Sequence, residues 1–151
     1  MTFVKWNNYY DYDFLVYIGY GFWVLGALFG ILPIIHFRRK GKIKKGDSYI
    51  KTTTLVTTGL YAIVRHPQYL AGVIISISLA FYSQHWVVIL LVLPTMICTY
   101  IDTFNAERKL VEKFGEQYIQ YKKQVPRLFP IVGIFKLIIR KVKRKEENVS
   151  D

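Results

Sequence analysis

The stretch that decides the fold is PQYLAGVIISISLAFYSQHWVVILLVLPTMICTYI, residues 67–101, which contains no Asp, Glu, Lys or Arg. As one helix it would be about 52 Å long, far more than the roughly 30 Å of a bilayer core. Near its middle, residues 83–86 (SQHW) are polar and permit a turn, and the tryptophan suits a membrane interface. The stretch therefore predicts a helical hairpin with arms over 67–82 and 86–103.

A second uncharged block, residues 14–35, precedes the hairpin. As a helix it would be about 33 Å long, which matches a single membrane crossing. Its basic residues, at 38–40, follow the apolar run, whereas those of a secretory signal come before it. The two blocks together predict an all-α integral membrane protein with about three transmembrane helices, at 14–36, 67–82 and 86–103. Gly26 and Gly30 form a small-residue pattern that lets another helix approach closely.

Charge is separated from apolar residues along the chain, which combines 52% hydrophobic residues with a net charge of +11. With three spans, residues 38–66 and 104–151 share one side, which holds 20 of the 21 Lys and Arg. The positive-inside rule predicts that this side is cytoplasmic. The basic residues flank apolar blocks, so we expect contact with membrane lipid and not with nucleic acid. A single cysteine and three scattered histidines predict no metal site.

The polar segments predict one domain over 1–151, with a core at 55–130 and a basic interfacial tail at 131–151. The tail begins apolar (IVGIFKLII) and ends basic, which predicts a helix lying in the membrane interface. Residues 38–58 form a basic loop suited to anionic lipid, and a turn is expected at 57–61.

Residues 102–130 carry an apolar helical stripe with one carboxylate, Glu107, among aromatic and aliphatic side chains. Gly115 weakens a continuous helix by about 1 kcal/mol, so one bent helix and two shorter helices are both compatible with the pattern. Glu107 has two interpretations. It either forms an ion pair on a helix flank, for example with Arg65, or it belongs to a ligand site.

Arg65 and His66 stand directly before Pro67, at the expected start of a helix, where the partial charge is positive and anions are favoured. One interpretation is a basic flank that reaches the interface ahead of a span. The other is a bound anion, a carboxylate or phosphate, shared between these side chains and the free N–H groups of the helix. A carboxylate at Glu107 nearby would complete a site for a ligand with both charges.

At these residues the chain resembles the membrane methyltransferases that comprise isoprenylcysteine carboxyl methyltransferases and phospholipid N-methyltransferases. The resemblance rests on LVTTGLYAIVRHPQYLAG (55–72) and ERKLVEKFGEQYIQYKKQVPRLFP (107–130), separated by a hairpin of similar length. It implies a helical membrane fold, S-adenosylmethionine as methyl donor, and a cytoplasmic cofactor pocket closed by the C-terminal segment. The acceptor would be a lipophilic or prenylated small molecule that enters from the lipid.

The resemblance also implies roles for individual residues. Arg65 and His66 would meet the carboxylate end of the donor, with Tyr69 near the same pocket. Glu107 would bind the amino group or ribose hydroxyls of the donor. The remaining implied residues are two tyrosines that would pack on the adenosine or sulfonium and an arginine that would close the pocket or orient the acceptor: Tyr118, Tyr121 and Arg127.

Two features depart from the family pattern. Many members have two adjacent glutamates where this chain has Ala106-Glu107, which puts acceptor specificity in doubt. The N-terminal region has one clear span, so a second subunit would be needed to complete an acceptor tunnel. The leading hypothesis is transfer to a prenylcysteine-type carboxylate. The alternatives are a phospholipid amine acceptor, a non-catalytic membrane scaffold that retains the fold, and a lipid reductase that uses a nicotinamide cofactor.

Overall fold

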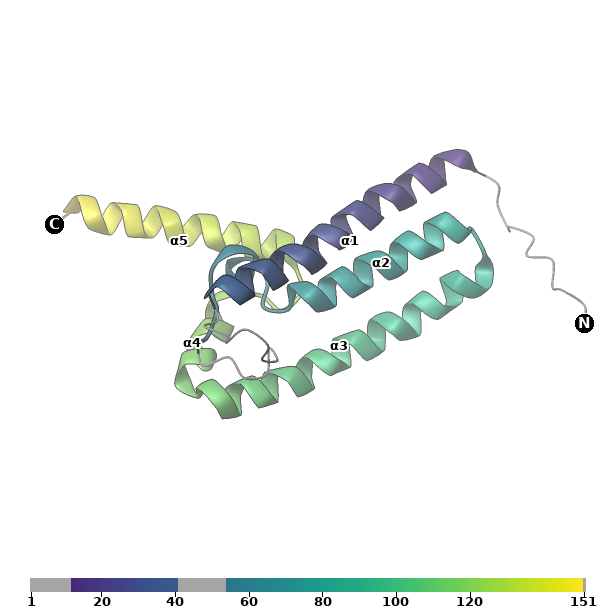
Figure 1. Ribbon diagram of the computed structural model, residues 1–151. Coiled ribbons are helices and arrows are strands. Elements are labelled where there is room, and N and C mark those ends of the chain that lie inside the picture. Colours follow the sequence, from purple (N-terminus) through teal and green to yellow (C-terminus); the bar gives the residue numbers. More distant parts are fainter. Residues whose placement is uncertain (1–11, 41–53, 151) are drawn as a thin grey trace, which may run out of the picture. The chain divides into compact units, whose positions relative to one another are not determined.

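The computed structural model describes residues 12–40 and 54–150. Over these residues the regular structure is helical: α1 (Asp13–Lys40), the 3-10 helix η2 (Gly59–Ala62), α2 (Pro67–Ser83), α3 (Trp86–Phe114), α4 (Glu116–Gln124) and α5 (Pro130–Ser150) (Figure 1). They belong to two compact units. Met1–Gly30 and Gln68–Asp102 form the first, called the apolar unit, and Ile31–Pro67 and Thr103–Asp151 form the second, called the polar unit.

The predicted hairpin is present in the apolar unit, where α2 and α3 are separated by Gln84 and His85. Gln84 adopts a left-handed backbone conformation with φ 48°, which reverses the chain. Its side-chain amide forms two hydrogen bonds with the backbone of Tyr12, one as acceptor and one as donor. The Tyr12 N–H donates to Oε1 at 2.9 Å, and Nε2 donates to the Tyr12 carbonyl at 3.0 Å. The turn is therefore joined to the start of α1.

The small residues of α1 allow α2 to approach closely. A Cβ added at Gly26 would lie 2.6 Å from Cγ1 of Ile75, so only glycine fits there without a shift. About one turn after Ile75 along α2, the Ser78 hydroxyl donates to the Gly19 carbonyl at 2.7 Å. The close approach expected from the small-residue pattern is confirmed, and its partner is α2.

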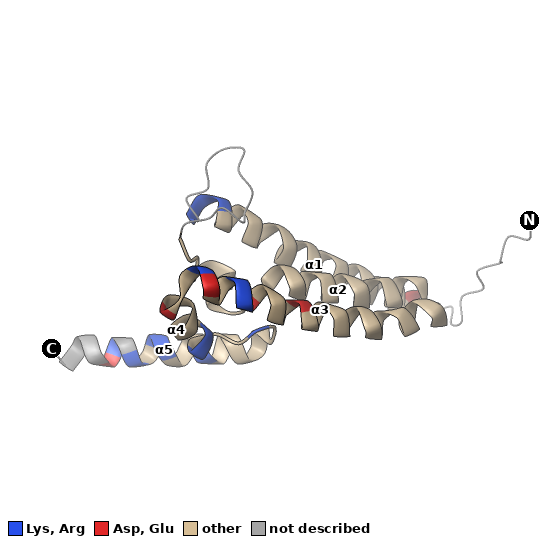
Figure 2. Ribbon diagram, turned by 90° about the horizontal axis from the view of Figure 1, so that it is seen from below, with Lys and Arg blue, Asp and Glu red and all other residues tan. Residues whose placement is uncertain are grey.

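Two of the helices, α1 and α3, are long and apolar enough to cross a membrane, and α2 is a shorter apolar helix. Large apolar side chains on α3 remain exposed, among them Leu90 and Leu93. The helix starts agree with the sequence prediction, but α3 does not end near 103. It continues to Phe114, because no Gly or Pro interrupts residues 95–114. Figure 2 shows that α2 carries no charged residue and that charges lie on the later part of α3 and on α4 and α5.

The polar unit contains a bend at Gly115, which has φ 55° and separates α3 from α4. The two-helix alternative is therefore correct. Tyr118, Tyr121 and Val125 of α4 form a buried cluster with apolar side chains from the end of α3. The turn expected at 57–61 is present as η2, and the expected tail helix is α5. Most of the basic loop predicted at 38–58 lies outside the described residues.

Candidate active site

Glu107 is the centre of a cluster of charges in the polar unit, six residues beyond the end of the uncharged part of α3. Its side chain is buried, with 3% of the residue exposed. Arg127 binds it through two hydrogen bonds, Nε to Oε1 at 3.0 Å and Nη2 to Oε2 at 2.9 Å. Arg65 Nη2 donates to Oε1 at 2.7 Å, and Lys122 Nζ lies 3.1 Å from Oε2. The structure thus brings together Glu107, Arg65 and Arg127.

Arg65 also has a structural role at the end of α4. Its Nη1 donates to the carbonyl oxygens of Lys122 at 2.6 Å and Val125 at 2.8 Å, where α4 ends. The C-terminus of a helix carries negative partial charge and favours cations. A basic residue that looks misplaced before α2 therefore lies at a favourable end of a different helix.

The backbone next to Arg65 holds the two arginines of the cluster in register. The N–H of Arg65 donates to the carbonyl of Pro126 at 3.0 Å, and the N–H of His66 donates to that of Arg127 at 3.2 Å. Residues 65–66 and 126–127 are thus paired side by side. This pairing explains why segments about 60 residues apart in sequence deliver their guanidinium groups to one carboxylate.

Burial and charge act in opposite directions on the two titratable groups at the centre. Burial lowers the pKa of His66 to about 4, although Glu107, whose Oε1 is 3.4 Å from Nε2, acts to raise it. Burial alone would raise the pKa of Glu107, but hydrogen bonds from Arg127 and the charge of Arg65 lower it to about 2. At neutral pH the cluster therefore contains an ionised carboxylate beside a neutral imidazole.

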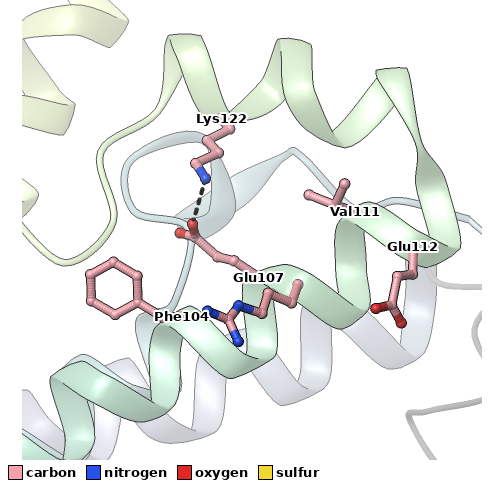
Figure 3. A pocket seen from close by; sticks show the side chains of 6 residues that line it. Phe104, Glu107, Val111, Glu112 and Lys122 are labelled. Atoms are coloured by element: carbon pink, nitrogen blue, oxygen red, sulfur yellow. Dashed lines mark ion pairs between the residues drawn. The ribbon is translucent and has the colours of Figure 1, made fainter.

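An open hollow of about 350 Å³ lies next to Glu107, between α3 and α4 (Figure 3). Its lining combines two carboxylates, two cations and two apolar side chains: Glu107, Glu112, Arg108, Lys122, Phe104 and Val111. Figure 3 shows Glu107 and Lys122 pointing toward each other from the two helices. A volume of this size falls at the lower end of the range for small-molecule sites.

The two predicted tyrosines are not among the residues that line this hollow. Tyr118 and Tyr121 border a small cavity of about 60 Å³ that Arg65 also lines, which is room for about two water molecules. The Tyr121 hydroxyl donates to the Tyr61 carbonyl at 2.6 Å. The Tyr118 hydroxyl is buried and has no hydrogen-bond partner among the described residues. Burial raises the pKa of both phenols, so both remain protonated at neutral pH.

Tyr69, the remaining predicted residue, is half-buried in the first turn of α2 and belongs to the apolar unit. Two residues that contact Glu107 or Arg127 were not assigned a role from sequence, Lys122 and Phe104. Phe104 packs under Arg127, whose guanidinium carbon lies 3.7 Å from the ring centroid. Lys122 follows Tyr118 by four residues, and this one-turn spacing is the signal that places it on the same side of α4.

The phospholipid methyltransferase family matches residues 14–117, which include the hairpin and Glu107. The chain belongs to this family. Among individual proteins, it is similar to protein-S-isoprenylcysteine O-methyltransferases. That of Homo sapiens is 35% identical over 90 residues, which are 54% of this chain and 29% of the relative. That of Schizosaccharomyces pombe is 30% identical over 106 residues, 64% of this chain and 45% of the relative.

This member of the phospholipid methyltransferase family thus spans less than half the length of those relatives. No solved structure matches it. The family match contains Arg65, His66 and Glu107, whereas Arg127 lies beyond its end. The geometry of the site therefore adds two partners of Glu107 that the family match does not include, Lys122 and Arg127.

Proposed function

We propose that the chain is a membrane methyltransferase that takes a methyl group from S-adenosylmethionine and transfers it to the carboxylate of a prenylated cysteine. The observation that carries the proposal is the buried, ionised Glu107, held by Arg65 and Arg127 beside the open hollow. Membership of the phospholipid methyltransferase family and similarity to isoprenylcysteine O-methyltransferases support it.

The side chains around the hollow fit the charges of this donor, which carries an ammonium, a carboxylate and a sulfonium. Glu107 would bind the ammonium, and the cations around it, Arg65, Arg127 and Lys122, would attract the carboxylate. The donor itself supplies an activated methyl group. Lys122 is the partner of Glu107 that a ligand would displace most readily, because its side chain is 45% exposed, against 8% for Arg65 and 14% for Arg127.

The electrostatics of the site favour a carboxylate acceptor over an amine. A carboxylate is already nucleophilic at neutral pH, so the protein need only position it and exclude water. A lipid amine with a pKa near that of lysine, about 10.4, must first lose a proton to a base. Glu107, with a pKa of about 2, and His66, with a pKa of about 4, are both weak bases at neutral pH.

The remaining residues act by positioning. Arg127 is clamped between Glu107 and the ring of Phe104, so its guanidinium is fixed in orientation, and we assign it the alignment of the acceptor carboxylate. Tyr118 is assigned to the donor, because a buried hydroxyl without a protein partner costs about 1–3 kcal/mol unless a ligand or water satisfies it. The small cavity would have to widen for its ring to reach the adenosine.

We further propose that residues 14–36, 67–82 and 86–103 cross the membrane and that the polar unit faces the cytoplasm, as the distribution of basic residues indicates. A single chain of this kind forms one methyltransferase domain, with its cofactor core at 55–130. A second copy would supply the rest of an acceptor tunnel. Cross-linking of the protein in native membranes tests this last point, and a monomer with full activity would contradict it.

Methyl transfer from labelled S-adenosylmethionine tests the proposed reaction directly. The purified chain in lipid nanodiscs should label an S-prenylated cysteine with a free carboxylate, and should not label its methyl ester or phosphatidylethanolamine. Label in phosphatidylethanolamine instead would establish the amine alternative, and no label in any acceptor would favour a scaffold.

Lys122→Met and Lys123→Met form a matched pair for the donor site. Both lysines are exposed on α4, but of the two only Lys122 is paired with Glu107 and lines the hollow. Lys122→Met should change donor affinity several-fold, because it removes the displaceable partner of Glu107. Lys123→Met should leave the affinity unchanged, and an equal effect of both would place the donor elsewhere.

A further inference from the structure

The last helix, α5, is attached to the polar unit through one narrow face. A Cβ added at Gly133 would clash with the carbonyl oxygen of Ile63, so the helix backbone lies directly against the segment after η2. Arg140, two turns further on, donates through Nη2 to the Ala62 carbonyl at 3.0 Å and through Nη1 to Gln124 Oε1 at 3.2 Å. These contacts fix the first half of α5 to the end of η2 and the end of α4.

The opposite face of α5 is apolar and exposed. Ile131, Phe135, Ile138 and Val142 recur at intervals of four, three and four residues, which places them on one helical stripe. Between 51% and 71% of each of these residues is exposed. Three further exposed apolar residues widen the stripe: Val132, Ile134 and Ile139. At 100° per residue, Gly133 and Arg140 lie roughly 180° from its centre.

Lysines border the stripe on both sides. Lys136 and Lys143 lie along one edge, and Lys141 and Lys145 lie along the other. An apolar stripe with cationic edges is the pattern of a helix that lies in the plane of a membrane surface, with its apolar side chains below the headgroups. Lysines at that depth attract the phosphate groups of anionic lipids.

We propose that α5 is a docking helix for the anionic surface of a membrane, with the stripe inserted at the headgroup–acyl boundary and the lysines bound to lipid phosphates. The charges favour this occupant over a second copy of the helix, because two copies meeting through the stripe would bring like-charged edges together. Two helices of the same chain are long and apolar enough to cross a membrane, and a chain anchored in this way has a bilayer surface available to α5. The proposal does not depend on the proposed methyl transfer.

Docking through α5 has a consequence for the site. Ala62 and Ile63, which receive the two attachments, precede Arg65 by three and two residues. A docked α5 therefore holds the segment that delivers Arg65 and His66 at a fixed depth relative to the lipid surface. We expect α5 to insert more deeply in bilayers that contain anionic lipid, because the lipid phosphates attract its lysines.

The single cysteine of the chain makes a site-directed test practical. In the full-length protein with Cys98→Ser, a nitroxide label is attached at Phe135→Cys or, as the matched control, at Lys136→Cys. The variants are placed in phosphatidylcholine nanodiscs with and without phosphatidylglycerol. The label at 135 should be reached by lipid-dissolved oxygen and protected from a water-soluble nickel complex, and the label at 136 should show the opposite preference.

Equal access of the nickel complex to both positions would overturn the proposal. Spin coupling or disulfide-linked dimers through position 135 would identify a second copy as the occupant, and would also overturn it. The charge argument is tested by Lys136→Gln with Lys143→Gln, which should abolish the extra depth of the 135 label in phosphatidylglycerol. Lys109→Gln with Lys123→Gln removes the same charge outside α5 and should leave that depth unchanged.

Discussion

The apolar unit and the polar unit are held together by different forces. In the apolar unit, α1 and α2 meet through small residues such as Gly26, and a few hydrogen bonds, such as Ser78 to Gly19, fix their register. In the polar unit, one carboxylate, Glu107, pairs with two half-buried arginines and an exposed lysine. The first arrangement depends on shape and the second on charge balance, so the two units should respond to different perturbations.

The difference also indicates where chemistry takes place. A buried cluster of charges is costly to assemble, because each ion loses hydration that its partners must offset. Clusters with strongly shifted pKa values are found preferentially at functional sites. The comparison therefore favours the polar unit for the proposed donor site, and four changes test the comparison in order of expected effect.

Glu107→Gln should have the largest effect. It leaves the half-buried guanidinium groups of Arg65 and Arg127 without a counter-charge, and removal of one partner from a buried pair typically costs about 3–5 kcal/mol. The free energy of unfolding in detergent measures this loss. Glu112→Gln, the same change at an exposed position of α3, should cost less than about 0.5 kcal/mol. Similar values for the two variants would mean that the cluster does not stabilise the unit.

Acidification should weaken the polar unit in two steps. His66 has an ordinary pKa of 6.5 and a folded pKa of about 4, so the unfolded chain binds more protons between these values. Stability should thus fall as the pH drops from 6.5 to 4, by up to roughly 3 kcal/mol. The pKa of Glu107 is lowered from 4.5 to about 2. Stability should therefore fall a second time as the pH drops from 4.5 to 2, because protonation of Glu107 removes its ion pairs.

Melting temperatures across this pH range check both steps. His66→Gln should remove the loss of stability between pH 6.5 and 4 and retain the loss that Glu107 causes between pH 4.5 and 2. A wild-type profile that stays flat from pH 7 to 4, or rises on acidification, would show that His66 is not buried in its neutral form.

Gly26→Val should destabilise the apolar unit by about 1–3 kcal/mol, because its side chain would collide with Ile75 across the contact between α1 and α2. Gly21 lies on the same helix with nothing within 4 Å of an added Cβ. Gly21→Val is therefore the matched control and should be nearly neutral. Unfolding of the two variants in detergent measures the difference, which should disappear if α1 and α2 do not pack through this face.

The smallest expected effect is the change in unfolding free energy when one glycine from each unit is replaced by alanine. Gly115→Ala forces a Cβ into a left-handed conformation (φ 55°) at the bend between α3 and α4, which costs about 1 kcal/mol. Gly72→Ala meets no atom within 4 Å on a regular helix and should be neutral or slightly stabilising. The sign of the change in unfolding free energy separates the two positions. A loss at Gly72 equal to that at Gly115 would contradict the assignment of the bend.

The fold was largely predictable from local pattern. Absence of charge over residues 67–101 and polar residues in the middle are enough to predict a hairpin, and its turn falls at Gln84 as expected. The continuation of α3 to Phe114 was missed. The change from apolar to polar composition after Ile101 marks the end of the apolar segment, whereas the helix itself ends at Phe114, before Gly115.

The sequence identified Glu107, Arg65 and Arg127 as members of the site, but it did not predict the network of hydrogen bonds and ion pairs that joins them to the rest of the unit. Glu107 stood out as a carboxylate on an apolar stripe, and an ion pair with Arg65 was one of its two interpretations. The bonds from Arg65 to the carbonyls of Lys122 and Val125 depend on how segments distant in sequence pack, and no local pattern encodes them. Lys122 was missed for a related reason. In sequence it looks like any exposed lysine, and only the fold places it opposite Glu107.

Calorimetric titration of S-adenosylmethionine into the full-length protein in lipid nanodiscs tests the central claim, that the Glu107 cluster holds the methyl donor. Saturable binding is expected, weakened at least about tenfold by Arg127→Lys, because lysine cannot reproduce the two-point contact with Glu107. Leu93→Ala, an exposed position on the apolar part of α3, should bind like the wild type. No binding at millimolar donor, or equal binding by a folded Arg127→Lys variant, would contradict the claim.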